Sequence, residues 1–147
     1  MHRPVPGGAG VKADPVRVRR YLTLIRKNSL ELNNLIENNH LTPDSLELKA
    51  AKYLLIEIAE AMSNTIQHIL AKDMGLAVSG YIDAILKAYD SGLIDEDLFR
   101  RLKPFFDFRN SLVHRYWTID DTRLIENLAK GRHDFDRFIE AVESWMN

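Results

Sequence analysis

The sequence predicts an all-α protein, an up-and-down bundle of four to five helices. Apolar residues recur at intervals of three and four along most of the 147 residues, as they do on the buried face of a helix. Capping residues followed by proline mark helix starts, and glycines mark helix ends. No segment shows the alternation of apolar and polar residues that is typical of a strand. Helices of this kind, joined by short loops, form bundles.

The first helix is predicted to begin after Asp14 and to fade near Asn38. Asp14 can cap a helix whose first position is Pro15, where the missing N–H of proline costs nothing. The apolar positions recur at near-heptad spacing: Val18, Leu22, Ile25, Leu32 and Ile36. Such stripes favour small crossing angles between helices.

The second helix is predicted to be long. It starts from a second signal of the same kind, Thr42 followed by Pro43, and stops before Gly75. Its apolar stripe comprises Ala51, Leu54, Leu55, Ile58, Met62, Ile66 and Ile69.

Two further helices are predicted after Gly75. A short helix starts near Ser79 or Gly80 and ends at Ser91. Asp95 then caps a fourth helix, whose first turn is acidic and so suits the helix dipole. Pro104 lies inside this fourth helix, where proline can introduce a kink.

A single last helix is predicted after a break at residues 118–120. Its apolar side carries Leu124, Leu128, Phe135, Phe138, Val142 and Trp145. Residues 14–147 are therefore expected to form one helical domain. Residues 1–13, which are rich in glycine and proline, are expected to form a flexible leader.

Composition excludes several classes of protein. The chain has no cysteine, which excludes disulfides and thiolate metal sites and fits a location in the reducing cytoplasm. No apolar run approaches the length that spans a bilayer, so we expect no membrane association. The net charge of −1 conceals a basic segment, residues 98–116, with five basic residues against one acidic residue. Such a segment can bind a polyanion locally, although a solvated helix face is the simpler interpretation.

Four side chains within this basic segment are the strongest candidates for chemistry: Arg109, Asn110, His114 and Tyr116. Arginine binds phosphate and histidine transfers protons near neutral pH, so the set suggests phosphodiester chemistry that needs no metal. Asn110 and His114 share a helix face, whereas Arg109 and His114 point about 140° apart. Either the helix distorts, near Pro104 or near its end, or the site is composite. We favour a symmetric dimer in which each copy contributes its arginine and histidine to one cleft.

RNA can be cleaved without a metal because its 2′-hydroxyl serves as the nucleophile. His114 suits either proton transfer, from that hydroxyl or to the leaving 5′-oxygen. Arg109 suits the charge that builds on the phosphoryl oxygens, and Asn110 can donate a hydrogen bond to phosphate or orient the imidazole. The structural alternative is that an arginine and a histidine near a helix end serve only as capping or surface residues.

The motif resembles the signature of HEPN domains: Arg109, four residues, His114, with Asn110 after the arginine and Tyr116 two positions beyond the histidine. More narrowly, the run Arg-Asn-Ser-Leu-Val-His-Arg-Tyr resembles the HepT-like subfamily. The similarity continues from about residue 16 to the C-terminus.

The resemblance implies a HEPN-like, all-helical homodimer whose two motifs face one cleft. It implies a metal-independent ribonuclease that needs no cofactor and acts as the toxin of a toxin–antitoxin pair, with Arg109 and His114 as catalytic residues. The implied partner is a minimal nucleotidyltransferase antitoxin, which inactivates the toxin by attaching AMP to the tyrosine that matches Tyr116. AMP phosphates there would occupy the place of the substrate phosphate and reverse the local charge.

A line of polar residues on the second helix is the other candidate feature: Glu57, Glu60, Asn64 and His68. One interpretation is that Glu60, Asn64 and His68 support the cleft, for example by orienting His114. The other is an interhelical polar stripe, which is the more common role of such groups. Metal ligation through these residues is less expected, because no further histidine lies nearby in the sequence.

Two other functions remain open. The chain can be a non-catalytic HEPN module that binds RNA or a nucleotide, or that docks a nucleotidyltransferase. It can also be a structural subunit whose motif only joins two chains. Among the aromatic residues we expect Phe105 and Phe108 to pack in the core, whereas Trp117 is a candidate contact to a partner or to RNA.

Overall fold

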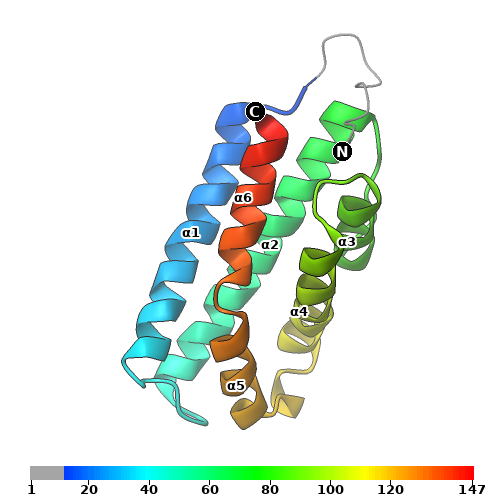
Figure 1. Ribbon diagram of the computed structural model, residues 1–147. Coiled ribbons are helices and arrows are strands. Elements are labelled where there is room, and N and C mark those ends of the chain that lie inside the picture. The colour runs from blue at the N-terminus through cyan, green and yellow to red at the C-terminus, as the bar shows by residue number, and fades with distance from the viewer. Residues whose placement is uncertain (1–11) are drawn as a thin grey trace.

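The computed structural model describes residues 12–147 and consists there of helices without strands (Figure 1). The predicted all-α class is confirmed. The elements are α1 (Pro15–Glu37), α2 (Leu46–Met74), α3 (Tyr81–Asp90), α4 (Glu96–His114), the 3-10 helix η1 (Tyr116–Thr118), α5 (Asp121–Gly131) and α6 (Asp134–Met146). None of the helices in this part of the chain is both long enough and apolar enough to cross a membrane.

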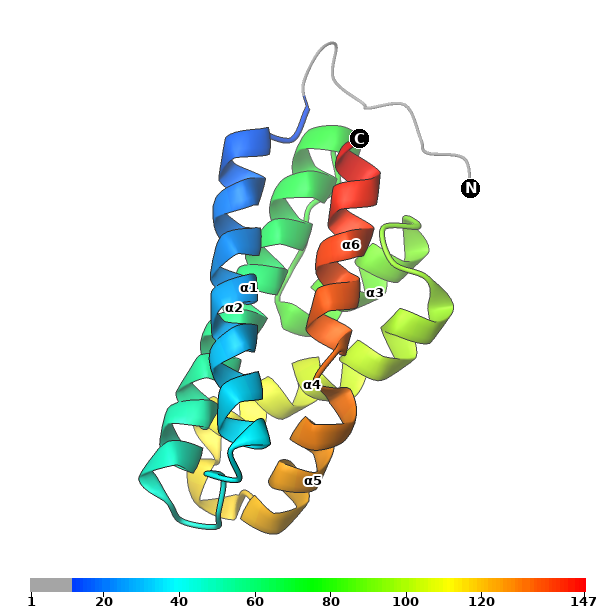
Figure 2. The ribbon, with the colours of Figure 1, turned by 60° about the vertical axis from the view of Figure 1, so that its left-hand side comes forward.

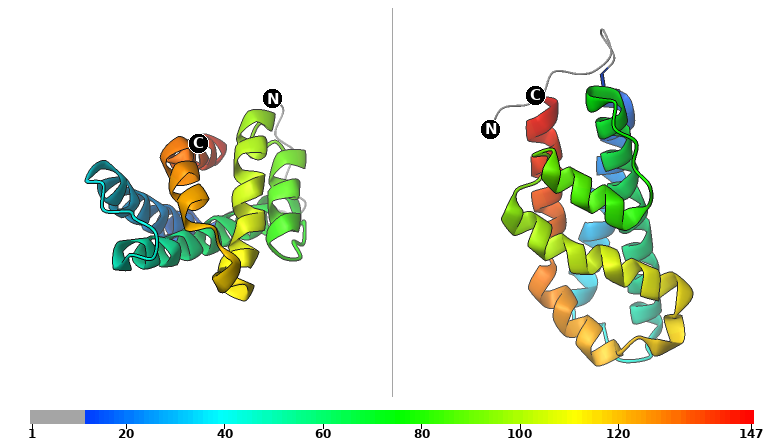
Figure 3. Two further views of the ribbon diagram at one scale, coloured as in Figure 1. Left: turned by 90° about the horizontal axis from the view of Figure 1, so that it is seen from below. Right: turned by 90° about the vertical axis from the view of Figure 1, so that its right-hand side faces the viewer.

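The long helices α1 and α2 run antiparallel and pack along each other, and α6 lies beside α1 (Figures 1 and 2). The α3–α4 hairpin runs obliquely across this layer (Figure 3). The apolar stripes meet between the layers, where Ile25, Ile58, Phe106 and Phe138 are fully buried. The oblique hairpin carries the motif helix α4 across α2, so the motif faces the middle of α2.

Side-chain caps begin the helices where the sequence predicted them in two cases. Asp14 accepts a hydrogen bond from the N–H of Val16 at 3.0 Å, and Asp95 accepts one from Leu98 at 2.8 Å. Gly75 ends α2 with a φ of 64°, a left-handed conformation that glycine adopts without strain.

The predicted start of the second helix is wrong by three positions. Thr42 and Pro43 belong to a turn closed by a hydrogen bond from the N–H of Ser45 to the carbonyl of Thr42, at 3.1 Å. Asp44 in this turn has a φ of 59° and so lies outside the helical region. Ser45 is the cap, and its hydroxyl accepts from the N–H of Leu48 at 3.0 Å.

The predicted single last helix is two helices, which brings the count of α-helices among the described residues to six. The chain turns at Arg132 and His133, directly after Gly131, which has poor helix propensity. Asp134 and Asp136 then supply an acidic first turn for α6. The apolar stripe continues across the break because α5 and α6 follow one another on the same side of the molecule (Figure 1).

The predicted leader falls mostly on residues 1–11, which lie outside the described residues. Its last residue, Ala13, is buried and donates its N–H to Asp73 at 2.7 Å. The other oxygen of Asp73 accepts from the indole N–H of Trp145, also at 2.7 Å. Asp73 thus ties the start of the described chain to the ends of α2 and α6.

Candidate functional site

Helix α4 is continuous from Glu96 through Pro104 to His114 and carries the motif in its last two turns. The helix ends at Arg115, whose N–H donates to the carbonyl of Ser111 at 2.9 Å. The chain then enters the 3-10 helix that contains Tyr116. The motif therefore spans a helix end and the turn after it, which places its residues on different faces.

Arg109 points toward α2 and α3, and its side chain is only 15% exposed. The guanidinium carbon lies 3.9 Å from the ring centroid of Tyr81, a cation–π contact. One terminal nitrogen lies 3.9 Å from a carboxylate oxygen of Glu60, and the other donates to the side-chain oxygen of Asn110 at 3.3 Å. Among the described residues, Nε of Arg109 has no hydrogen-bond partner although it is buried. Tyr81, Glu60 and Asn110 thus hold the guanidinium in place.

Tyr81 is a site residue that sequence reasoning did not identify. Burial raises the pKa of its hydroxyl, although the nearby Arg109 cation acts in the opposite direction. The ring therefore stays neutral and supports the guanidinium by its face. The sequence assigned Tyr81 only to an apolar helix position, because nothing in the spacing of residues 81 and 109 indicates that they meet.

His114 and Asn110 are exposed on the solvent side of α4. In the described chain no hydrogen bond or ion pair joins His114 to Arg109, as the predicted angle of about 140° between them requires. Neighbouring apolar side chains are exposed as well: Val113 by 43%, Tyr116 by 41% and Trp117 by 81%. Polar and apolar groups are thus exposed together at the end of α4. We call this set the motif surface: Asn110, Val113, His114, Tyr116 and Trp117.

Lys52 holds the turn after the motif. Its side chain is 7% exposed, and its ammonium lies 4.5 Å from the ring centroid of Tyr116 and 2.9 Å from Asp121. The Lys52 ammonium donates a hydrogen bond to the Asp121 carboxylate, and this bond is the main cause of the lowered pKa of that carboxyl. A second hydrogen bond, from the N–H of Asp44, lowers the pKa further. A buried lysine needs such a partner. Sequence reasoning also missed Lys52, because charge alone does not distinguish it from a surface lysine.

The polar line on α2 divides into separate environments. Glu60 lies beside Arg109, and Asn64 is exposed. Glu57 accepts a hydrogen bond from the side-chain amide of Asn28 on α1 at 3.0 Å. His68 lies two turns beyond Glu60, roughly 12 Å along the helix axis.

His68 is buried, and its Nε2 accepts a hydrogen bond from the N–H of Asp14 at 2.9 Å. Burial lowers the pKa of this imidazole, and the cations of Arg17 and Lys72 lower it further. This hydrogen bond ties His68 to the start of α1, not to the motif. Of the three suggested supporting residues, Glu60 is the one that pairs with a motif side chain among the described residues, at 3.9 Å from Arg109.

A model of HepT-like ribonucleases matches residues 18–142. The chain belongs to the HepT-like ribonuclease family. It is 32% identical over 129 residues to an Archaeoglobus fulgidus protein named "Putative RNase", and the alignment covers 87% of this chain and 94% of that protein. Membership supports a ribonuclease function, as the motif predicted.

The structure of YutE, a cytosolic protein of unknown function from Bacillus subtilis, has the same fold. It matches with a TM-score of 0.74 over 92% of each chain at 14% sequence identity. At this identity the likeness concerns the fold alone. The HepT-like helical bundle is therefore confirmed by the family model, the relative and the architecture together.

Proposed function

We propose that this protein is a metal-independent endoribonuclease that cleaves RNA in a cleft between two copies of the chain. The observation that supports it most is the position of Arg109, whose guanidinium Tyr81 and Glu60 hold in place. A donor held in advance toward developing charge is what transition-state stabilisation requires. Exposed His114, five positions along the same helix, supplies the titratable group.

The reaction is a transfer of the phosphoryl group within the RNA chain. The 2′-oxygen loses its proton and attacks phosphorus, and the bond from phosphorus to the 5′-oxygen breaks. The leaving 5′-oxygen takes up a proton, so the products are a 2′,3′-cyclic phosphate and a 5′-hydroxyl. His114 carries one of the two proton transfers, and Arg109 binds the phosphoryl oxygens through paired N–H groups. Asn110 donates to the phosphate or orients the imidazole.

Dimerisation supplies what one chain lacks. Within one chain Arg109 faces α2 and α3 while His114 faces solvent, so a single copy does not direct both side chains at one phosphate. The exposed Val113, Tyr116 and Trp117 beside them form an apolar surface that a second copy can cover. A two-fold axis at the motif surface brings two arginines and two histidines to one cleft.

We further propose that the protein is the toxin of a pair in which a minimal nucleotidyltransferase is the antitoxin. The target of modification is Tyr116, whose side chain is 41% exposed and whose ring is held by Lys52. AMP attached there introduces phosphate charge next to the cations that bind RNA. We place both the protein and its RNA substrate in the cytoplasm.

Cleavage of RNA by the purified protein in EDTA tests the activity. The parent is expected to release 2′,3′-cyclic phosphate ends with EDTA present, and His114→Ala is expected to be slower by about 10²–10⁴-fold. His133→Ala is the matched control, because His133 is also exposed but lies in the α5–α6 turn. RNA binding without products from the parent protein would identify a non-catalytic binding module instead.

Mixing two inactive variants tests the composite cleft. Arg109→Ala and His114→Ala chains, unfolded and refolded together, form some dimers with one intact arginine and one intact histidine. Cleavage by the mixture, well above that of either variant alone, is expected if the cleft combines side chains from two copies. A mixture that is as inactive as its components would contradict a shared cleft while leaving the ribonuclease assignment in place.

Intact mass after co-expression with a nucleotidyltransferase tests the proposed regulation. Mass increments of whole AMP units are expected on the parent chain and not on Tyr116→Phe. Tyr53→Phe serves as the control, because Tyr53 is more exposed than Tyr116, at 61%. AMP found on Tyr116→Phe in the same amount would exclude Tyr116 as the acceptor.

A further inference from the structure

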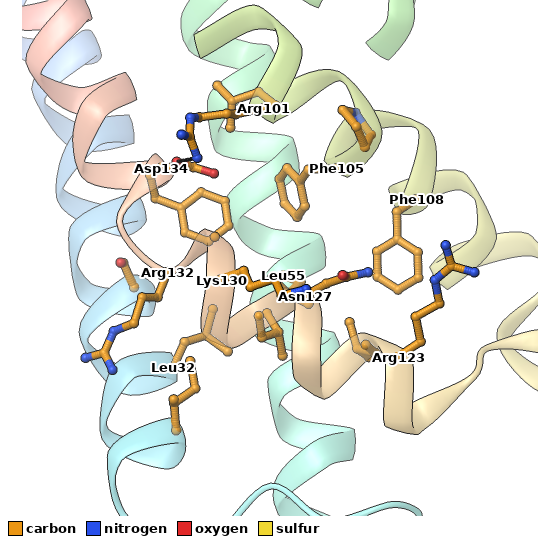
Figure 4. Close-up of a pocket in the computed structure, with 18 of the residues that line it drawn as sticks. Leu32, Leu55, Arg101, Phe105, Phe108, Arg123, Asn127, Lys130, Arg132 and Asp134 are labelled. Atoms are coloured by element: carbon orange, nitrogen blue, oxygen red, sulfur yellow. Dashed lines mark ion pairs between the residues drawn. The ribbon is translucent and has the colours of Figure 1, made fainter. Parts of the chain in front are cut away.

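A cavity of about 630 Å³ (Figure 4) is lined by residues of α1, α2, α4, α5 and α6, and Arg109 is not among them. Its α4 residues include Arg101, Phe105 and Phe108, which recur at intervals of three and four and so form one helix face. Arg109 instead faces α2 and α3, and His114 does not line this cavity. A volume of this size lies within the range of pockets that bind small molecules, roughly 300–1,000 Å³.

The walls of the cavity are aromatic and aliphatic. Phe105 and Phe108 come from α4 and Phe135 from α6, and the rings of Phe105 and Phe135 lie 5.1 Å apart in an edge-to-face arrangement. Leu32 and Leu55 line the side formed by α1 and α2. Phe105 and Phe108 pack against the core, as expected, but they are only half-buried, because the cavity lies against them. The ring surfaces that face the cavity can stack against a flat ligand.

Polar groups enter this apolar space from one face of α5. Arg123, Asn127 and Lys130 are spaced by four and three residues, so they share that face. Figure 4 shows Asn127 and Arg123 on α5 opposite Phe108 on α4. An amide among apolar walls offers both a donor and an acceptor to the edge of a planar ring.

The cavity is also basic. Its lining includes five cationic residues and two acidic residues, which sums to +3: Arg100, Arg101, Arg123, Lys130 and Arg132 against Asp120 and Asp134. Arg100, Arg101 and Arg132 are paired with carboxylates. Among the residues the structure describes, Arg123 and Lys130 form no ion pair, and both are exposed. They are therefore available for an anion at the mouth of the cavity.

We propose that this cavity binds a free nucleoside monophosphate, with its base between the phenylalanines and Asn127 and its phosphate on Arg123 and Lys130. The phenylalanine rings match the face of the base, the Asn127 amide matches the edge of the base, and the two cations match the phosphate. A fatty acid would use the apolar walls and a cation but has no ring edge to pair with the Asn127 amide. The site does not depend on the proposed nuclease cleft, because neither Arg109 nor His114 lines the cavity.

Titration calorimetry of the full-length protein with AMP, GMP, CMP and UMP tests the proposal. At least one nucleotide is expected to bind, and its nucleoside and inorganic phosphate, each lacking one part, should bind at least about tenfold more weakly. Binding of none at millimolar concentration would overturn the proposal. So would inorganic phosphate binding as tightly as the nucleotide.

Paired variants locate the binding. Arg123→Gln with Lys130→Gln is expected to raise the dissociation constant by about tenfold or more. Lys27→Gln, an exposed cation on α1 that does not line the cavity, should leave it unchanged. Both cavity cations are exposed, so their replacement should not affect folding, which circular dichroism checks.

Arg109→Gln separates this site from the nuclease cleft. The variant is expected to bind the nucleotide as the parent does, whatever its effect on RNA cleavage. Loss of binding in Arg109→Gln with retention in the Arg123 and Lys130 variant would place the nucleotide at the motif and overturn the proposal. A short 2′-O-methyl oligoadenylate that binds the cavity more tightly than AMP would identify a strand as the ligand and would also overturn it.

Discussion

Two sets of polar residues lie at different places along α2: Asp73 with His68, and Arg109 with His114. They differ in how many of their hydrogen-bonding atoms have partners. Near the end of α2, both oxygens of buried Asp73 accept hydrogen bonds, and Nε2 of His68 accepts another. Beside the middle of α2, Arg109 keeps a buried Nε without a partner among the described residues, and His114 is exposed. Satisfied buried groups are typical of structure, and unsatisfied or exposed ones of binding. We therefore expect the first group to stabilise the fold, and we propose that the second carries the chemistry.

A large effect on the rate of RNA cleavage is expected from Arg109→Ala. Loss of the guanidinium should lower the rate of RNA cleavage by about 10²–10³-fold, because the charge on the phosphoryl oxygens loses its donor. The free energy of unfolding should fall far less, since the loose pair with Glu60 and the contact with Tyr81 are worth about 1–2 kcal/mol. Initial cleavage rates and urea unfolding measure the two quantities.

Arg19→Ala is the matched control for Arg109→Ala, because Arg19 is an exposed arginine on α1 away from the motif. It should change neither quantity appreciably. A cleavage rate for Arg109→Ala within threefold of the parent rate would assign Arg109 to structure and remove the contrast between the two groups.

The reverse pattern is expected from Asp73→Ala. The change leaves the N–H of Ala13 and the indole N–H of Trp145 buried without their acceptor, which should cost about 2–4 kcal/mol of unfolding free energy. Cleavage per folded molecule should be unchanged. Asp90→Ala, at an exposed aspartate on α3, is the control. A loss below about 0.5 kcal/mol in urea unfolding would mean that Asp73 is not the structural tie described above.

A smaller effect is expected from Trp117→Ala on the motif surface. Trp117 is 81% exposed in one chain, and removal of an aromatic contact from a dimer interface should raise the dissociation constant of the dimer by about tenfold or more. Sedimentation over a dilution series measures it. Leu30→Ala is the control, since Leu30 is a 61% exposed residue on α1. Equal dissociation constants for both variants would place the dimer interface elsewhere.

Much of the fold was predictable because helix ends and apolar stripes are local properties. Asp14, Asp95 and Gly75 act where their residue types indicate. The two errors in helix bounds arose where the same local sequence is compatible with two backbone conformations. Pro43 is compatible with a turn as well as with a first helical position, and the stripe on either side of Gly131 continues even though the helix does not.

The candidate site was predictable only in part, because tertiary contacts decide the roles of its neighbours. A motif within one segment predicts Arg109, His114 and Tyr116 as site residues. Tyr81 and Lys52 reach that motif from other helices, and no spacing in the sequence indicates these contacts. The polar line of α2 is the opposite case. Its regular spacing suggested a common role, but a helix face about three turns long meets different neighbours at its two ends.

His68 provides the finest test of the comparison, through the dependence of stability on pH. Burial lowers the pKa of His68 in the folded protein, so below about pH 6.5, the ordinary value, the unfolded chain binds more protons. Stability should therefore be complete above that pH and should fall as the pH drops toward about 5. Protonation also removes the acceptor for the N–H of Asp14, a hydrogen bond with a net contribution of about 1 kcal/mol.

The measurement is urea unfolding across this pH range for the parent, His68→Gln and His40→Gln. The slope of stability with pH should become shallower in His68→Gln, because glutamine does not titrate. It should persist in His40→Gln, because His40 is exposed. The flanking Arg17, Lys72, Asp14 and Asp73 remain in all three proteins and so do not account for a difference. If His68→Gln keeps the parent slope, the acid sensitivity belongs to other groups, and the two histidines do not differ in the way their surroundings predict.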